Sequence, residues 1–186
     1  MTFDGNEFLY LLEMRNGKWL MPEAEIKNEQ PYQAVIRLAE DCTGVHPHAV
    51  ELSHASTEDG DMVLHYLVTA RLMECEGSDD YPNEVQWFQQ WHEEMQHKAN
   101  ANTAEHAMQT LRDEAFLRPI LFSMLPEEFP MANLQRLYEQ TYQRTLDRRN
   151  FRKHVRAMDM VDEREDPTYK GHYMGRLKHF PEPRLL

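Results

Sequence analysis

The sequence predicts an α+β protein in which a mixed N-terminal part is followed by a mainly helical C-terminal part that ends in a β-hairpin. Charge divides the chain first: residues 1–110 carry 6 Lys and Arg against 20 Asp and Glu, a net charge of −14, while residues 111–186 carry 14 against 12, a net charge of +2. Strand and helix patterns alternate up to about residue 100, and helical patterns dominate beyond it. This asymmetry indicates two modules.

The first half of the chain is predicted to form strands around one helix. Gln33–Cys42 places apolar residues at spacings of three and four, which predicts an amphipathic helix, and Thr43-Gly44 supplies its C-terminal stop. Branched and aromatic residues favour strands elsewhere. The expected strands or extended pieces are Glu7–Met14, Lys18–Pro22, Val50–Leu52 and Met62–Leu72, with turns at Asn16-Gly17 and Glu58–Asp61, and Val85–Phe88 is a short apolar segment.

The second half is predicted to form helices and a hairpin. Apolar spacing predicts helices over Thr103–Leu117 and Met131–Gln140, and Asp147 is a good N-cap for the next helix. The buried stripe expected for that helix is Phe151, Val155 and Met158. Two strands, Met160–Val161 and Tyr173–Phe180, are expected around the loop Asp162–Gly171. Helix, turn, helix and hairpin in this order are the outline of a winged helix.

Composition argues against several classes of protein. No stretch approaches the roughly 20 apolar residues of a membrane span, and the N-terminus lacks the basic start and apolar run of a secretory signal. Cys42 and Cys75 are far apart in the sequence, which favours reduced thiols and a cytoplasmic protein. The histidines are scattered, with His46-x-His48 as the closest pair, whereas a structural zinc site usually needs four ligands. We therefore expect no membrane contact, no metal and no cofactor.

A basic cluster surrounds the predicted helix after Asp147. Six basic residues stand against one acidic residue between positions 144 and 156. The functional interpretation is a recognition helix on DNA, and the alternative is a solvated face that pairs with the acidic N-terminal half. Asn150 can read adenine or cap a local turn. The candidate DNA contacts are Arg144, Arg148, Arg149, Asn150, Arg152, Lys153 and Arg156, followed in the hairpin by Lys170, Arg176 and Lys178, where surface solubility is the alternative.

Two strings in the second half carry a family resemblance. They are Leu125-Pro-Glu-Glu-Phe-Pro-Met-Ala-Asn-Leu-Gln-Arg-Leu-Tyr-Glu139 and Leu146-Asp-Arg-Arg-Asn-Phe-Arg-Lys153. Both resemble the winged-helix domain of Nudix-related transcriptional regulators, and the similarity runs from about Glu105 to Phe180. The resemblance implies a winged helix-turn-helix domain that binds DNA, and it favours the DNA interpretation of the basic cluster.

A second stretch resembles the Nudix box. Trp19-Leu-Met-Pro22 is similar to the Trp-x-Leu-Pro that precedes the box, and anchoring on Gly44-Val45 puts Arg37 and Glu29 at the arginine and early glutamate positions. The resemblance implies a Nudix-like α/β/α domain. It is a trimmed one, because only about seven residues precede the first expected strand. Either the sheet is shortened or an edge strand is left open to pair with another subunit.

The metal ligands of this box are replaced. Glu23 stands at the box glycine, Leu38 at the first glutamate, and Asp41-Cys42 at the final glutamate pair. Mg²⁺ prefers hard oxygen ligands, which leucine and cysteine do not offer. The box is therefore degenerate, and we expect no hydrolysis and no catalytic residues. The candidate ligand-binding residues are Glu29, Arg37 and Asp41, and the alternative is that Arg37 only pairs with an acidic residue across the box loop.

The resemblance also implies the organisation of the whole chain. A sensor domain is expected at 1–100, a connecting helix at 101–124 and the DNA-binding domain at 125–186. A homodimer would bind a palindromic operator in double-stranded DNA and respond to a nucleotide- or sugar-related metabolite, such as an ADP-ribose-like compound. Two alternatives come from other classes: a Nudix-type pyrophosphohydrolase with an altered metal site, and a protein-binding adaptor.

Overall fold

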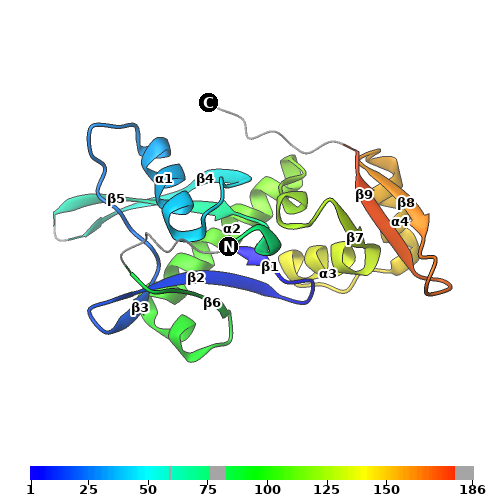
Figure 1. Ribbon diagram of the computed structural model, residues 1–186, viewed down its shortest axis with the longest axis horizontal. Coiled ribbons are helices and arrows are strands. Elements are labelled where there is room, and N and C mark those ends of the chain that lie inside the picture. The colour runs from blue at the N-terminus through cyan, green and yellow to red at the C-terminus, as the bar shows by residue number, and fades with distance from the viewer. Residues whose placement is uncertain (59, 76–82, 179–186) are drawn as a thin grey trace.

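The computed structural model describes residues 1–58, 60–75 and 83–178. Figure 1 shows strands β1–β6 and helix α1 at one end of the molecule and strands β7–β9 with helices α3 and α4 at the other, with the long helix α2 between them. The mixed N-terminal part and the helical C-terminal part predicted from the sequence therefore occupy opposite ends of the molecule.

The first sheet is built around β2 (Phe8–Arg15). This strand pairs antiparallel with β1 (Thr2–Phe3), β3 (Lys18–Leu20) and β6 (Val85–Gln89). Asn16 and Gly17 both have positive φ, 52° and 75°, and join β2 to β3 by a two-residue turn. A type I′ hairpin requires this backbone conformation, which explains why Asn-Gly predicted the turn.

The edge of β2 near its start is covered by a short strand. Thr2 pairs with Leu9 and Phe3 with Phe8, so β1 lies on the edge that the sequence left in question. The Met1 ammonium donates a hydrogen bond to the carbonyl of Val68 at 2.8 Å, which links this strand to β5. Within the chain, β1 covers only the start of this edge, and pairing of the edge with another subunit stays a prediction.

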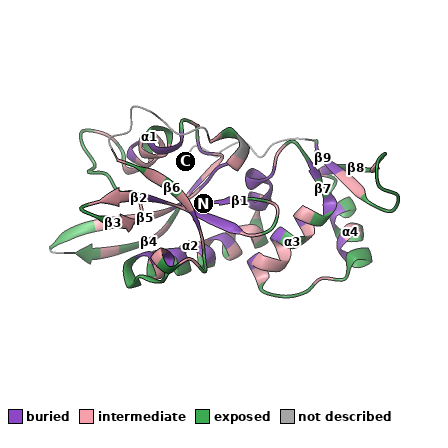
Figure 2. Ribbon diagram, turned by 60° about the horizontal axis from the view of Figure 1, so that its bottom comes forward, coloured by how far each residue is buried: buried purple, intermediate pink, exposed green. Residues whose placement is uncertain are grey.

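A long hairpin and two helices complete this end. It contains α1 (Pro31–Thr43), β4 (Ala49–Glu58), β5 (Asp61–Thr69), the 3-10 turns η1 (Leu72–Glu74) and η2 (Glu93–Gln96), and α2 (Lys98–Leu117). Gly44 ends α1 with φ 74° and donates its N–H to the carbonyl of Glu40 at 2.8 Å. Figure 2 shows the strands between α1 and α2, the layered arrangement expected of a Nudix-like domain.

Several boundaries differ from those the sequence predicted. β4 continues well beyond Leu52, because its polar second half pairs with β5 as far as Glu58 and Asp61. β5 ends at Thr69, and α2 begins at Lys98 rather than Thr103. Backbone pairing and packing set these ends, so the side-chain pattern alone does not reveal them.

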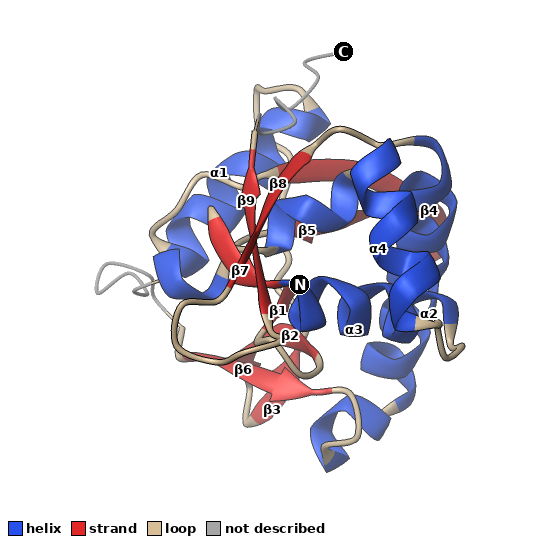
Figure 3. Cartoon of the chain, turned by 90° about the vertical axis from the view of Figure 1, so that its right-hand side faces the viewer, coloured by secondary structure: helices blue, strands red, loops and turns tan. Residues whose placement is uncertain are grey.

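The C-terminal end is a winged helix. It consists of the 3-10 turn η3 (Ile120–Met124), β7 (Glu128–Pro130), α3 (Met131–Tyr142), α4 (Arg148–Ala157), β8 (Val161–Glu165) and β9 (Tyr173–Leu177). The strands form a sheet in the order β7-β9-β8, which lies beside α4 in Figure 3. β7 was not predicted, and β8 runs through the charged residues 162–165 that the sequence assigned to a loop. Phe180, at the end of the last expected strand, lies outside the described residues.

The stripe predicted for α4 is correct at two positions and wrong at the third. Phe151 and Val155 are buried, with exposed fractions of 7% and 2%. Met158 is 48% exposed, because the helix ends at Ala157 and Met158 is its C-cap residue.

Buried apolar side chains form one continuous cluster from end to end. It contains Leu12 of β2, Leu111 of α2, Phe122 of η3, Leu134 of α3 and Val155 of α4. The domain boundaries predicted at residues 100 and 124 therefore divide elements that share one core, and these boundaries stay a prediction. None of the helices among the described residues combines the length and apolar character that a bilayer span requires.

Candidate nucleic-acid interface

Helix α4 turns a basic face away from the core. The carboxylate of Asp147 accepts a hydrogen bond from the backbone N–H of Asn150 at 2.9 Å and caps the first turn, as predicted. Phe151 and Val155 bury one side of the helix. At 3.6 residues per turn, Lys153 then projects almost directly away from this buried side. The amphipathic spacing of α4 thus leaves Arg149, Lys153 and Arg156 facing outward.

Two of the basic residues are held by the wing, the hairpin of β8 and β9. Arg152 and Arg156 both pair with Glu163 of β8, and Arg156 Nε lies 2.6 Å from Glu163 Oε2. The Arg152 guanidinium also lies over the ring of Tyr173, 3.3 Å from its centroid. Only 6% of the Glu163 side chain is exposed, and its carboxylate forms ion pairs with both guanidinium groups.

A third arginine ties α4 to the tip of the wing. Arg148 Nη2 donates to the carbonyl of Gly171 at 2.7 Å. Gly171 has φ 78°, a conformation that favours glycine, so the sharp turn of the tip brings this carbonyl toward α4.

Another set of predicted residues faces an open surface. Arg149, Asn150 and Lys153 are exposed and line a shallow concavity of about 650 Å³ together with Asp147 and Arg156. The basic residues predicted on this helix therefore lie together, and three of them also contact the wing.

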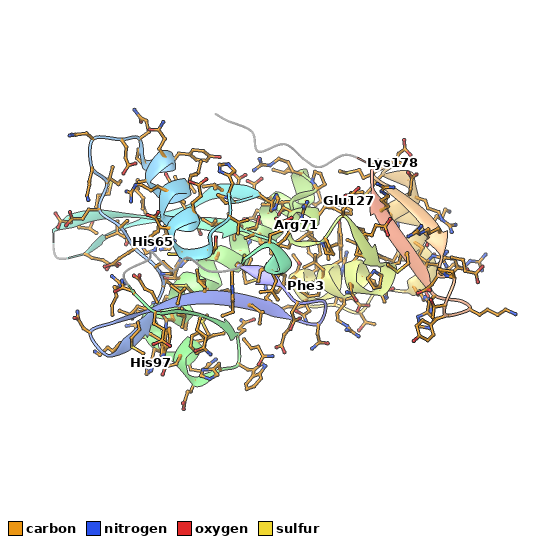
Figure 4. The ribbon with its side chains drawn as sticks, viewed as in Figure 1. Phe3, His65, Arg71, His97, Glu127 and Lys178 are labelled. Carbon is orange, nitrogen blue, oxygen red and sulfur yellow. The ribbon has the colours of Figure 1, made fainter. Side chains whose placement is uncertain are left out.

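The other predicted DNA contacts lie outside α4. Arg144 precedes α4, with its guanidinium 5.4 Å from the centroid of the Tyr142 ring, and Lys170 is exposed at the wing tip. Arg176 pairs with Glu127 at 2.9 Å, on the face of β9 opposite Gly175. Lys178 lies beyond the end of β9 and pairs with Asp159 at 2.5 Å (Figure 4). The structure does not bring Arg176 and Lys178 together with the exposed face of α4.

Sequence reasoning missed the partners that organise this surface. Glu163 fell in a predicted loop, and Tyr173 and Gly171 were read only as strand and turn residues. Each lies seven or more residues away from the arginine it contacts, so no local spacing pointed to these contacts.

The Nudix-like end brings its three candidate ligand residues together as an ion-pair chain. Arg37 Nη2 lies 2.6 Å from Glu29 Oε1, and Arg37 Nη1 lies 3.7 Å from Asp41 Oδ2. The hydrogen bond from Arg37 holds the pKa of Glu29 below its usual value. Whether these residues bind a ligand stays a prediction. The geometry matches the alternative in which Arg37 pairs with an acidic residue across the box loop.

The replaced metal positions of the box lie on α1. Cys42 is buried, with 1% exposure, and Leu38 is half-buried. Within residues 1–58, 60–75 and 83–178, no group of three or more His, Cys, Asp or Glu side chains is arranged to hold a metal ion.

The C-terminal end matches a known domain family. Residues 121–174 match the NrtR DNA-binding winged helix domain. The chain is similar in fold to Shewanella oneidensis NrtR, with 20% identity, a TM-score of 0.76, and coverage of 95% of this chain and 90% of that one. The same protein complexed with a 27mer DNA gives 20% identity, a TM-score of 0.78 and the same coverage.

A Nudix protein is also similar in fold. A MutT/nudix family protein from Enterococcus faecalis gives 19% identity and a TM-score of 0.64, with coverage of 91% of this chain and 80% of that one. No curated protein matched the chain. The comparisons thus confirm the predicted α+β fold class and the resemblance to Nudix-related transcriptional regulators: the chain has a fold similar to that of NrtR, and its residues 121–174 match the NrtR DNA-binding winged helix domain.

Proposed function

We propose that the protein is a sequence-specific DNA-binding transcriptional regulator in the cytoplasm, whose Nudix-like end senses a small molecule and is not an enzyme. The observation that carries the proposal is the match of residues 121–174 to a DNA-binding winged helix, with the exposed basic face of α4 at its surface. NrtR, which shares the fold, has been crystallised with a 27mer DNA. DNA is accordingly the proposed partner of the α4 face.

Charge supports this assignment despite the net −12 of the chain. Residues 1–110, with a net charge of −14, form most of the end that lies away from α4 (Figure 1). Surface charges are screened over about 10 Å at ordinary ionic strength, so the basic residues near α4 dominate its approach to phosphate. The acidic end then disfavours non-specific binding of DNA elsewhere on the molecule.

We further propose a homodimer on a palindromic operator. One α4 reads one half-site, and paired half-sites one helical turn apart need two recognition helices related by two-fold symmetry. A small molecule bound at the Nudix-like end would act by favouring one arrangement of the two α4 helices, which requires different affinities for the two arrangements. A nucleotide- or sugar-related metabolite, such as an ADP-ribose-like compound, is the proposed effector.

The absence of hydrolysis is also proposed, from the residues at the box. Leu38 supplies no ligand atom and the Cys42 thiol is a poor partner for Mg²⁺. Arg37 already neutralises Glu29 and approaches Asp41, so the carboxylates that remain are engaged. An assay with Mg²⁺ and ADP-ribose is expected to show no turnover. Turnover that Asp41→Ala abolishes would establish the hydrolase alternative instead.

Selection from a random duplex DNA pool at near-physiological salt tests the proposal. The wild-type protein is expected to enrich one palindromic motif. The double variant Arg149→Ala, Lys153→Ala is expected to lose this enrichment. Lys18→Ala with Lys98→Ala removes the same charge from exposed positions at the other end and is expected to keep it. A folded wild-type protein that enriches no motif would refute the proposal and favour the adaptor alternative.

A further inference from the structure

The basic residues of α4 differ in the contacts that they make within the protein. Arg152 and Arg156 pair with Glu163, and Arg152 also stacks on Tyr173. The side chain of Arg152 is only 18% exposed. A guanidinium that is fixed in this way has little freedom to reach a base edge or to follow phosphates of varying position.

Three other polar residues of α4, Arg149, Asn150 and Lys153, are exposed on its outward side. With 100° per residue, Lys153 lies opposite the buried pair Phe151 and Val155, and Arg149 and Asn150 lie within about 60° on either side of it. All three line the same concavity. They also occupy the first two turns of the helix, the part of a recognition helix that meets base edges.

We propose that Glu163 is a positioning residue that keeps Arg152 and Arg156 on the wing, so that sequence readout falls to Arg149, Asn150 and Lys153. The inference rests on the proposed DNA-binding function and divides its contacts. Arg149 and Lys153 suit guanine, whose N7 and O6 both accept hydrogen bonds, and Asn150 suits adenine. The half-site is therefore expected to contain guanine and adenine at adjacent positions under the start of α4.

The carboxylate has a physical role in selectivity. Phosphate contacts do not distinguish sequences, and every additional cation that can reach phosphate strengthens binding to any DNA. Glu163 neutralises one of two neighbouring guanidinium groups and anchors both, at 6% exposure. Removing its charge would leave two adjacent cations without an acidic partner, and they would be freer to turn toward phosphate.

The first test is Glu163→Gln, measured on a random duplex by fluorescence anisotropy from about 50 to 200 mM salt. The salt slope is the slope of log K for binding against log salt concentration. If two guanidinium groups are released, this slope becomes steeper by up to about 1.8. The variant then loses roughly ten times more affinity than the wild-type protein between the two salt concentrations. Glu165→Gln is the matched control, because it removes one negative charge from the same strand, and no arginine pairs with Glu165 among the described residues. A role in folding alone would instead weaken binding of every duplex.

Equal salt slopes for Glu163→Gln and Glu165→Gln would overturn the positioning role. A weaker affinity of Glu163→Gln for random DNA would overturn it as well. Glu163→Asp keeps the charge and is expected to restore the wild-type slope.

The second test uses variants of α4, of which Arg149→Ala and Lys153→Ala change exposed side chains and are not expected to unfold the protein. Arg149→Ala and Lys153→Ala are each expected to reduce the preference for the correct base over a wrong one, at one base pair of the selected motif, by about 5- to 150-fold. Arg152→Ala is expected to weaken all duplexes alike and leave the motif unchanged. A changed motif with Arg152→Ala and an unchanged one with Arg149→Ala would refute the assignment. Failure of the wild-type protein to select any motif would instead refute the proposed function.

Discussion

Replacing Asp147 by alanine tests whether α4 depends on its side-chain cap. The Asp147 carboxylate accepts the N–H of Asn150 at 2.9 Å, and its own backbone is extended, with φ −66° and ψ 122°, as an N-cap requires. Loss of such a cap typically costs about 1 kcal/mol. The carboxylate also lies at the positive end of the helix dipole, which contributes about 0.3–1 kcal/mol at low salt. The expected total is about 1.5 kcal/mol.

Asp147→Asn is the matched control for this prediction. Asparagine caps as well as aspartate does but carries no charge, so it is expected to lose only the dipole contribution. A chain of this length changes its melting temperature by roughly 2–4 °C per kcal/mol. Thermal unfolding followed by circular dichroism should therefore place Asp147→Ala about 3 °C below Asp147→Asn.

The same pair of variants separates helix order from charge in DNA binding. Both remove one negative charge beside the basic face, so their electrostatic effects on binding are equal. A weaker binding of the alanine variant reports the frayed first turn that carries Arg149 and Asn150. Equal melting temperatures for the two variants would refute the reasoning, because the cap would then contribute nothing.

Three further predictions concern packing, pH and metal. A Cβ at Gly175 would lie 2.7 Å from Phe129 Cε2 and 2.8 Å from Met131 Sδ. Gly175→Ala should therefore lower the free energy of unfolding, measured in urea, by about 1–3 kcal/mol. An unchanged urea midpoint would contradict the close packing of β9. Burial lowers the pKa of His54 and of His65, whose rings stack at 3.9 Å, so stability is full above a pH of about 6.5 and falls as the pH drops below it. His54→Phe should reduce the difference between urea midpoints at about pH 7.5 and pH 5.5, and an unchanged difference would contradict this origin. Millimolar Mg²⁺ should leave the melting temperature unchanged, whereas a rise that depends on Mg²⁺ concentration would reveal a bound ion.

The sequence predicted those parts of the fold that local chemistry determines. Apolar residues at helical spacing predicted α1 and α4, and Asn16-Gly17 and Gly44 predicted a hairpin turn and a helix end because few residues adopt positive φ at low cost. Asp147 was identified as the cap of α4 for a similar reason. The exposed basic residues of α4 followed from the same spacing.

Features that depend on distant pairing were not predicted. β8 contains a run of charged residues and forms only because β9 pairs with it, and the polar half of β4 forms because β5 pairs with it. The same limit applies to the candidate site. Charge and the family resemblance suggested that Arg152 contacts DNA, and neither indicated that Glu163 and Tyr173 contact its side chain. A sequence pattern gives the type and face of a side chain but not its partner across the fold.

The most direct test of the central claim is the affinity of the wild-type protein for its selected duplex relative to a scrambled duplex, measured at about 150 mM salt. A sequence-specific regulator is expected to bind the selected duplex at least about 10³-fold more tightly. Equal affinities for the two duplexes, falling together as salt rises, would contradict the claim, because binding would then come from phosphate contacts alone.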